Sequence, residues 1–406
     1  MTINETPSQA HPFINFEISL HVTNTELWLL LGEARAKREY LGQALLLPDI
    51  AQELHRLYLA KGVLATTAIE GNTLSEEEVL KHLRGELELP PSKKYLEREI
   101  DNLVRACNLI GVKAQRGEGL AVTEDAIAEF NEQVLEGLDL PEGVVPGRLR
   151  EYEVEVARHR APAPHECGPL LKSLCEWLNG PDFEPPEAEG MAEVYAVLKA
   201  IVAHVYLDWI HPFGDGNGRT GRLVEFMILV DAGLPPPSAH LLSNHYNQTR
   251  GEYYRQLDQA TWSGDLMPFL LYAVRGFVDQ MRQQLAVIHE QNRSLIWKRH
   301  VEDKSPGPPS EAQTRRRELA LALAEAGTTS VARLKELTPR LAGMYGAKTL
   351  KTLSRDLHAL EAQALVVRVE GEAYRARVEA LQLLLRQRRA SRRTSATSAL
   401  PGEPAQ

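Results

Sequence analysis

The sequence has few cysteines, few aromatic residues and no long apolar run. Its 406 residues include three cysteines, Cys107, Cys167 and Cys175, and only 6% aromatic residues. An odd number of cysteines cannot pair completely, and their spacing matches no metal site, so we expect a reducing compartment and a cytoplasmic protein. No apolar run could span a bilayer, and the polar start at Met1 has no basic segment before an apolar one. We therefore expect neither membrane association nor a secretory signal.

The composition is typical of a globular protein with more than one domain. Hydrophobic residues make up 43% of the chain and charged residues 25%. The net charge of -9 is uneven, because residues 311–406 hold 17 Lys and Arg against 10 Asp and Glu, whereas residues 1–310 hold 29 against 45. An acidic body and a basic C-terminal part indicate separate partners, with a polyanion as a candidate for the second. A basic tail that only solvates the chain end is the alternative.

Helical periodicity dominates residues 1–300, and signals for strands are scarce. Gly71-Asn72 predicts a tight turn, and Thr73-Leu74-Ser75-Glu76 predicts a capping box that begins the next helix. Alternation between Gly147 and Arg160 predicts the one extended hairpin of this part. Helices are expected over 25–45, 48–65, 96–113, from the N-cap Thr123, and over 191–210, 219–232 and 280–300.

A proline-rich linker over 303–310 precedes a different pattern. Three helices are expected over 315–326, 331–337 and 348–364, followed by two short strands over 365–374, which is the order of a winged-helix module. Its third helix has the pattern of a recognition helix, whose polar side carries Lys351, Ser354, Arg355 and His358. DNA contact through residues 313–393 is one interpretation, and a protein-binding or homodimer unit is the other.

The most informative segment is His211-Pro-Phe-Gly-Asp-Gly-Asn-Gly-Arg-Thr-Gly-Arg222. A glycine-rich turn at a helix N-terminus directs backbone N–H groups into one small volume that favours an anion. Arg219 and Arg222 lie one turn apart and suit phosphate contacts. Asp215 is a hard oxygen ligand for magnesium, and His211 can accept a proton near neutral pH. Together they predict a nucleotidyl- or phosphoryl-transfer site.

This segment resembles the signature His-x-Phe-x-Asp/Glu-Gly-Asn-Gly-Arg-x-x-Arg of the Fic family. Every defined position is matched, by residues His211, Phe213, Asp215, Gly216, Asn217, Gly218, Arg219 and Arg222. The resemblance implies a helical protein that transfers AMP from ATP to a Ser, Thr or Tyr hydroxyl of a target protein and releases pyrophosphate.

The resemblance also implies residue roles. His211 is expected to deprotonate the hydroxyl, Asp215 to hold Mg2+, and Phe213 to support the loop from the core. The residues expected to contact ATP are Gly216, Asn217, Gly218, Arg219, Thr220, Gly221, Arg222, Tyr253 and Tyr254, the two tyrosines because they resemble the adenine side of the site. Ordinary core tyrosines are the alternative for the last two.

A second match lies upstream, in Thr66-Thr-Ala-Ile-Glu70-Gly71. It resembles the family's inhibitory pattern Ser/Thr-x-x-x-Glu-Gly/Asn, and it implies that Glu70 pairs with Arg222 and occupies the place of the terminal phosphate. The alternative is a charged residue before a helix stop. The 147–160 hairpin matches the family's flap, on which a segment of the target protein docks as an added strand.

These observations predict a mostly α fold, a Fic-type helical core with a β-hairpin flap plus a C-terminal winged-helix domain. The expected divisions are 1–115 with an inhibitory helix at about 60–72, a core over 116–285, helix and linker over 286–312, the winged helix over 313–380 and a disordered basic tail over 381–406. Two other functions stay open: a DNA-binding regulator that uses the core as a nucleotide sensor, and an enzyme that removes AMP at the same site. A kinase-like variant is disfavoured, since Gly216-Asn217-Gly218 lacks the lysine that marks it.

Overall fold

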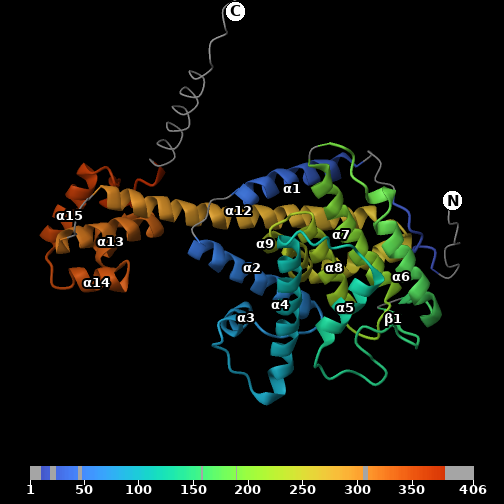
Figure 1. The fold of residues 1–406 in the computed structure, drawn as a ribbon. Coiled ribbons are helices and arrows are strands. Elements are labelled where there is room, and N and C mark those ends of the chain that lie inside the picture. The colour runs from blue at the N-terminus through green and yellow to red at the C-terminus, as the bar shows by residue number, and fades with distance from the viewer. Residues whose placement is uncertain are drawn as a thin grey trace, which may run out of the picture. The chain divides into compact units, whose positions relative to one another are not determined.

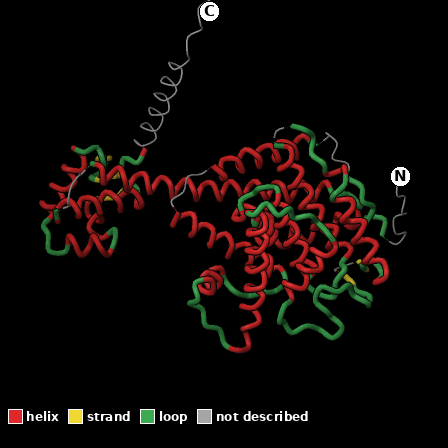
Figure 2. The backbone as a smooth tube through the Cα atoms, in the orientation of Figure 1, coloured by secondary structure: helices red, strands yellow, loops and turns green. Residues whose placement is uncertain are grey.

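The computed structural model describes residues 11–18, 24–43, 48–156, 159–188, 190–304 and 310–379. Helices make up most of it, and strands occur as one two-stranded and one three-stranded sheet (Figures 1 and 2). The expected mostly α fold is therefore confirmed. The chain divides into two compact units, Met1–Leu285 and Ala286–Gln406, and the second begins inside the long helix α12 (Met267–Asp303).

The first unit is a bundle of helices of very different lengths. Before the flap it contains α1 (Thr25–Gln43), α2 (Pro48–Ile69), α3 (Glu76–Leu83), η1 (Pro91–Lys93), α4 (Lys94–Gln115) and α5 (Glu124–Leu135). After the flap come α6 (Pro164–Leu178), η2 (Pro181–Phe183), α7 (Met191–Ile210), α8 (Asn217–Asp231), α9 (Pro236–Ala239), α10 (Leu241–Gln248), α11 (Arg250–Ser263) and the start of α12. We expected α12 to begin near residue 280, but it begins at Met267. The side chain of Asp265 accepts the backbone N–H of Met267 and caps the start of this helix.

The two central helices, α7 and α8, pack along each other and form the core of this unit. Almost every side chain of α7 from Val194 to Ile210 is buried, as its apolar composition on all sides predicts. The helix α8 is also contacted by α2, α4 and α5. The short loop between α7 and α8, residues 211–216, is the first half of the signature segment, so both ends of this loop are held by buried helices.

The turn after α2 has the geometry that its residues predict, but the next helix begins two residues later than expected. Gly71 has a φ of +105°, which a residue with a side chain rarely adopts. The capping box is formed by Ser75, whose hydroxyl accepts the N–H of Glu78, while Glu78 accepts the N–H of Ser75 at 2.8 Å. The expected box at Thr73 and Glu76 was therefore wrong in register. Asn72 explains the shift, because its carboxamide oxygen accepts the N–H of Leu74 and keeps that residue outside the helix.

The predicted hairpin over 147–160 is shorter than expected. Its strands are β1 (Glu155–Val156) and β2 (His159–Arg160), which pair antiparallel. The preceding stretch does not join this hairpin, since Leu149 instead forms a β-bridge with Phe213 of the signature loop. The base of the flap is thus bound directly to the segment that carries the signature.

The second unit combines the end of α12 with α13 (Glu311–Ala326), β3 (Thr329–Ser330), η3 (Val331–Glu336), α14 (Pro339–Tyr345), α15 (Leu350–Ala362), β4 (Val366–Val369) and β5 (Ala373–Ala376). The strands form one antiparallel sheet in the order β3-β5-β4. The expected helix over 331–337 is a 3-10 helix, and α14, which we did not expect, follows it behind the N-cap Thr338. The winged-helix assignment itself stays a prediction.

The core of the second unit includes one buried ionic cluster. Asp356 of α15 accepts hydrogen bonds from Arg315 at 2.7 Å and from the Tyr345 hydroxyl at 3.0 Å. Apolar side chains from α12 to β5 surround it, among them Trp297, Leu319 and Leu357. The predicted disordered tail over 381–406 and residues 305–309 of the predicted linker lie outside the described residues.

Two further features concern the whole chain. Cys107, Cys167 and Cys175 are buried free thiols. Among the described residues, no helix is both long and apolar enough to cross a membrane.

The observed capping box makes a prediction that separates it from the expected one. Ser75→Ala should lower the free energy of unfolding of the first unit by about 1 kcal/mol, because the N–H of Glu78 in the first turn of α3 loses its partner. Thr73→Ala, the matched control, should leave it nearly unchanged, since Thr73 is exposed and precedes the helix. Urea unfolding followed by far-UV circular dichroism measures both. Equal losses in the two variants would contradict the assignment.

Candidate active site

The signature loop is closed by the side chain of Asn217, the first residue of α8. Its carboxamide oxygen accepts the N–H of Phe213 at 2.9 Å, and its NH2 group donates to the Phe213 carbonyl at 2.8 Å. Phe213 is itself buried in the core. Because the backbone N–H and carbonyl of Phe213 are both held by the side-chain amide of Asn217, the loop is preformed. Its backbone then leads into the N-terminus of α8, where free N–H groups favour an anion.

The other side of the loop is held by Asn131 of α5, a fully buried residue. Its NH2 group donates to the Asp215 carbonyl at 2.9 Å, and its oxygen accepts the N–H of Gly147 at 3.0 Å. Gly216 has a φ of +77°, and a Cβ there would lie 3.0 Å from the Asn131 amide. Glycine is thus required at 216 by both conformation and space.

His211 forms the C-cap of α7 and is one of the few residues other than glycine with a positive φ, at 46°. Its Nδ1 lies 3.3 Å from the carbonyl oxygen of Asp208, a geometry that favours the proton on Nδ1 and leaves the lone pair of Nε2 free. Burial lowers the pKa of His211, although Asp208 and Glu70 act in the opposite direction. The imidazole is therefore neutral at pH 7 and able to accept a proton.

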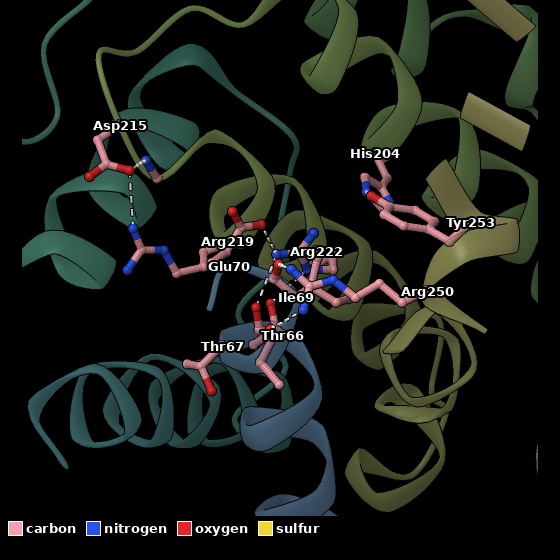
Figure 3. A network of polar contacts seen from close by, with 12 residues as sticks. Thr66, Thr67, Ile69, Glu70, His204, Asp215, Arg219, Arg222, Arg250 and Tyr253 are labelled. Carbon is pink, nitrogen blue, oxygen red and sulfur yellow. Dashed lines mark hydrogen bonds and ion pairs between the residues drawn. The ribbon is translucent and has the colours of Figure 1, made fainter. Parts of the chain in front are cut away.

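The predicted inhibitory contact between Glu70 and Arg222 is present in the structure (Figure 3). Arg222 is 2% exposed, and its Nη2 lies 2.5 Å from Oε1 of Glu70, which follows the last turn of α2. The same guanidinium donates to the Thr66 hydroxyl at 2.7 Å and to the Thr66 carbonyl at 3.0 Å. All three contacts come from one helix end, so α2 presents a ready-made site for this cation.

The carboxylate of Glu70 also touches the signature loop. A Cβ added to Gly218 would lie 2.3 Å from its Oε1, so the carboxylate rests against the first turn of α8. Burial raises the pKa of Glu70. The charge and hydrogen bond of Arg222, with smaller contributions from Arg219 and His211, lower it by more than burial raises it, so the net pKa is below its ordinary value. Glu70 is thus an anion at the place where the signature predicts phosphate.

Arg219 is bound by two carboxylates, of which the sequence suggested neither. Its Nη1 lies 2.8 Å from Oε1 of Glu99 on α4, and its Nη2 lies 3.1 Å from Oδ1 of Asp215. The other oxygen of Glu99 accepts a hydrogen bond from Asn72 at 2.9 Å, directly after the turn that follows Glu70. Glu99 therefore connects the turn after α2 to Arg219. No local pattern marks it, since it becomes visible only when α4 packs on α8.

Four of the residues expected to contact ATP instead contact other parts of the protein. Thr220 and Gly221 face α5 and α7, where the Thr220 hydroxyl lies 3.3 Å from the Asn131 amide and Gly221 packs against His204. Tyr253 is 1% exposed and its hydroxyl lies 3.0 Å from Nε2 of His204, so its ring is a core side chain.

The fourth of these residues, Tyr254, is 43% exposed, but its hydroxyl donates to the Ile69 carbonyl at 3.2 Å. Arg250 donates to the carbonyls of Ala68 and Ile69. The two side chains therefore hold the C-terminal end of α2, a role that the sequence did not indicate.

Comparison with known proteins agrees with this geometry. Residues 121–229, which include Asn131 and the whole signature loop, match the model of the Fic/DOC family. The chain contains a Fic/DOC-family domain. Glu70 lies outside the matched range.

Two curated relatives carry names that describe an activity. Protein adenylyltransferase fic-1 of Caenorhabditis elegans is 30% identical over 243 residues, which are 60% of this chain and 44% of the relative. Protein adenylyltransferase Fic of Nematostella vectensis is 32% identical over 211 residues, 52% of this chain and 45% of the relative. This chain thus spans about half the length of the curated relatives it matches.

Two solved structures are similar in fold. A Fic family protein from Desulfovibrio desulfuricans G20 has a TM-score of 0.54 at 20% identity, covering 89% of this chain and 98% of its own. A segment of Fic-1 from C. elegans has a TM-score of 0.54 at 25% identity, covering 65% of this chain and 73% of its own. The first comparison shows the fold alone.

The ion pair between Glu70 and Arg222 predicts that the stability of the first unit depends on pH. Because the folded pKa of Glu70 is below its ordinary value of 4.5, the contribution of the pair is complete above pH 4.5 and is lost as the pH falls through the folded pKa. Glu70→Gln should therefore unfold at lower urea than wild type at pH 7, and the difference should shrink toward pH 3.5. The exposed Glu86→Gln serves as the control. A difference for Glu70→Gln that is the same at both pH values would contradict the ionic pairing.

Proposed function

We propose that the chain is a protein adenylyltransferase that transfers AMP from ATP to a hydroxyl side chain of a target protein and is held inactive by Glu70. One observation carries this proposal. A neutral imidazole, a preformed helix N-terminus and two buried arginines lie within the twelve residues 211–222, and Glu70 forms an ion pair with one of these arginines, Arg222. The names of the curated relatives support the type of reaction. A cytoplasmic location is part of the proposal and is supported by the three free thiols.

His211 is the base of the proposed reaction. Its Nε2 takes the proton of the target hydroxyl, the oxygen forms a bond to the α-phosphorus of ATP, and the bond from that phosphorus to the β-phosphate oxygen breaks and releases pyrophosphate. The contact between Nδ1 and the Asp208 carbonyl holds the tautomer that this step needs. The N-terminus of α8 with Asn217 and Gly218, together with Arg219 and Arg222, would hold the phosphates and stabilise the charge that develops on them.

Asp215 fits the role of a magnesium ligand. Its side chain is 39% exposed at the loop, and the groups bound to it, the Gly216 N–H and Arg219, both contact Oδ1. Mg2+ in nucleotide sites is commonly held by one or two carboxylates together with phosphates and water. Among the described residues, no cluster of three or more His, Cys, Asp or Glu could hold a metal alone. The ion would therefore bind with the nucleotide and neutralise charge on the phosphates.

The flap around β1 and β2 is the proposed docking place for the target. Its base is bound to the signature loop through the bridge between Leu149 and Phe213. An extended segment of the target added at this edge would run past His211, so that a Ser, Thr or Tyr hydroxyl reaches the base. Backbone hydrogen bonds would supply affinity there.

The inhibitory contact leads to the main test. Glu70→Gly should raise labelling of the protein by alpha-labelled ATP about tenfold or more, because Arg222 becomes free for the terminal phosphate and about 1.4 kcal/mol in the barrier is a factor of ten. It should also lower the melting temperature, since a largely buried cation loses its partner. A gel-based transfer assay and thermal unfolding measure the two effects.

The controls separate inhibition from catalysis. Glu86→Gly removes an exposed carboxylate and should not change labelling. Glu70→Gly combined with His211→Ala or with Arg222→Ala should be inactive. If the protein is labelled by gamma-labelled ATP and not by alpha-labelled ATP, the reaction is phosphoryl transfer and the adenylyl-transfer proposal is contradicted. Removal of AMP from a labelled protein by wild type would favour the reverse reaction.

A second candidate function, nucleic-acid binding, concerns the second unit only. Lys351 and Arg355 lie one turn apart on the exposed face of α15 and form no ion pair with any residue that the structure describes, while the opposite face holds Leu353 and Leu357 in the core. Two free cations on an amphipathic helix suit contacts with nucleic-acid phosphates. We propose DNA contact through this face.

Charge reversal tests that contact. Arg355→Glu should weaken binding of the full chain to random-sequence double-stranded DNA about tenfold and make the salt dependence less steep, because a phosphate contact is replaced by repulsion. Arg340→Glu is the matched control, since Arg340 is paired with Glu318 on another helix. Fluorescence anisotropy at several salt concentrations gives both values. If wild type does not bind DNA, or if both variants lose the same affinity, the proposed DNA contact through α15 is contradicted.

A further inference from the structure

Arg150, at the base of the flap, is a buried cation that the signature does not include. It is 3% exposed, and its guanidinium donates to three carbonyl groups: His211 at 2.8 Å, Tyr152 at 2.8 Å and Pro162 at 2.5 Å. Its backbone N–H donates to the Pro212 carbonyl at 3.0 Å. Two consecutive carbonyls at the end of α7 are therefore held by one residue.

The three carbonyls belong to segments that the proposed reaction must bring together. Tyr152 lies just before β1 and Pro162 just after β2, so two bonds of Arg150 close the two ends of the flap. The third bond and the backbone bond hold the two successive peptides that follow His211. The φ of His211 is 46°, which is unfavourable for a residue with a side chain. Only a planar group with several fixed donors can serve three acceptors in this way.

Among the residues that the structure describes, Arg150 forms no ion pair with a carboxylate. Its charge is stabilised by the three carbonyl groups and by a hydrogen bond with the Cys167 side chain. A buried cation of this kind acts on its ionisable neighbours. The charged groups that influence His211 are Asp208 on α7, Glu70 at the end of α2 and Arg150 itself, and of these only Arg150 favours the neutral imidazole.

We propose that Arg150 is a positioning residue that joins the flap to the base, so that an acceptor segment docked on the flap and the imidazole of His211 keep one fixed arrangement. Its charge has a second effect, because it opposes the two nearby carboxylates and keeps His211 ready to accept a proton. The inference rests on the proposed function for the identity of the acceptor. The contacts between Arg150, the flap and His211 do not depend on it.

The first experiment does not require activity. In the full chain with 13C-labelled histidine, NMR follows the titration of the His211 ring, which His211→Gln assigns. Arg150→Met should raise the pKa of His211, since removing a cation favours the imidazolium form. Arg150→Lys keeps the charge and should shift it less. Arg148→Met, an exposed arginine two residues earlier, is the matched control and should leave the titration unchanged.

The second experiment uses Glu70→Gly as the parent and measures labelling by ATP. Arg150→Lys should lower kcat about tenfold, because an ammonium cannot bind three carbonyls in one plane, and it should leave the KM for ATP within twofold. In Arg150→Met the acid limb of the kcat profile should also move to higher pH, in step with the His211 titration.

The outcomes separate this inference from the proposed function. A parent that transfers no AMP would contradict the proposed function, and the NMR titration would still decide whether Arg150 acts on His211. An unchanged His211 titration in a folded Arg150→Met protein would overturn the proposal. If Arg150→Met does not fold, Arg150→Lys decides: a lower kcat with an unchanged KM for ATP supports the positioning role, and an unchanged kcat overturns it.

Discussion

The buried guanidinium of Arg222 is the group on which the arrangement of the site depends. A cation that is 2% exposed must find its hydrogen-bond partners inside the protein, and the end of α2 supplies them through Thr66 and Glu70. Once α2 ends at this point, its last carbonyls meet Arg250, and the following turn brings Asn72 to Glu99. The ion pair between Glu70 and Arg222 therefore anchors the end of α2, and it is the same contact to which the proposed function assigns the inhibition.

Both arginines of the signature are already paired in this structure. Arg222 is bound to Glu70, and Arg219 is shared by Glu99 and Asp215. In the proposed function, a nucleotide would have to replace these anions, so part of its interaction energy would be used to separate existing ion pairs. The two arginines would then already be in place for the phosphates, and the affinity for the nucleotide would be lower. Since Glu99 contacts Asn72, movement of the α2 end also changes the surroundings of Arg219.

The sequence predicted the local features of this site and missed those that need distant partners. The signature loop, the Thr123 cap and the turn at Gly71 follow from neighbouring residues, and the structure contains each of them. The roles of Glu99 and Arg150 were not predictable, because their partners lie 120 and 61 residues away and no spacing pattern marks such a contact. For Tyr253 the sequence left two interpretations open, an adenine wall or a core side chain, and its burial against His204 favours the second. Competition between nearby caps explains the error in the capping box, since Asn72 decides between Thr73 and Ser75.

The missing side chain of Gly218 has a consequence for how this protein can evolve. The space in front of its Cα is filled by the Glu70 carboxylate, and it is the same space that a phosphate at the α8 N-terminus would need. Under the proposed function, a side chain at 218 would meet both the Glu70 carboxylate and the phosphates, so a substitution there should disturb inhibition and activity together. Substitutions that remove the proposed inhibition and keep the activity are then expected at the end of α2, around residues 66–72, with the loop intact.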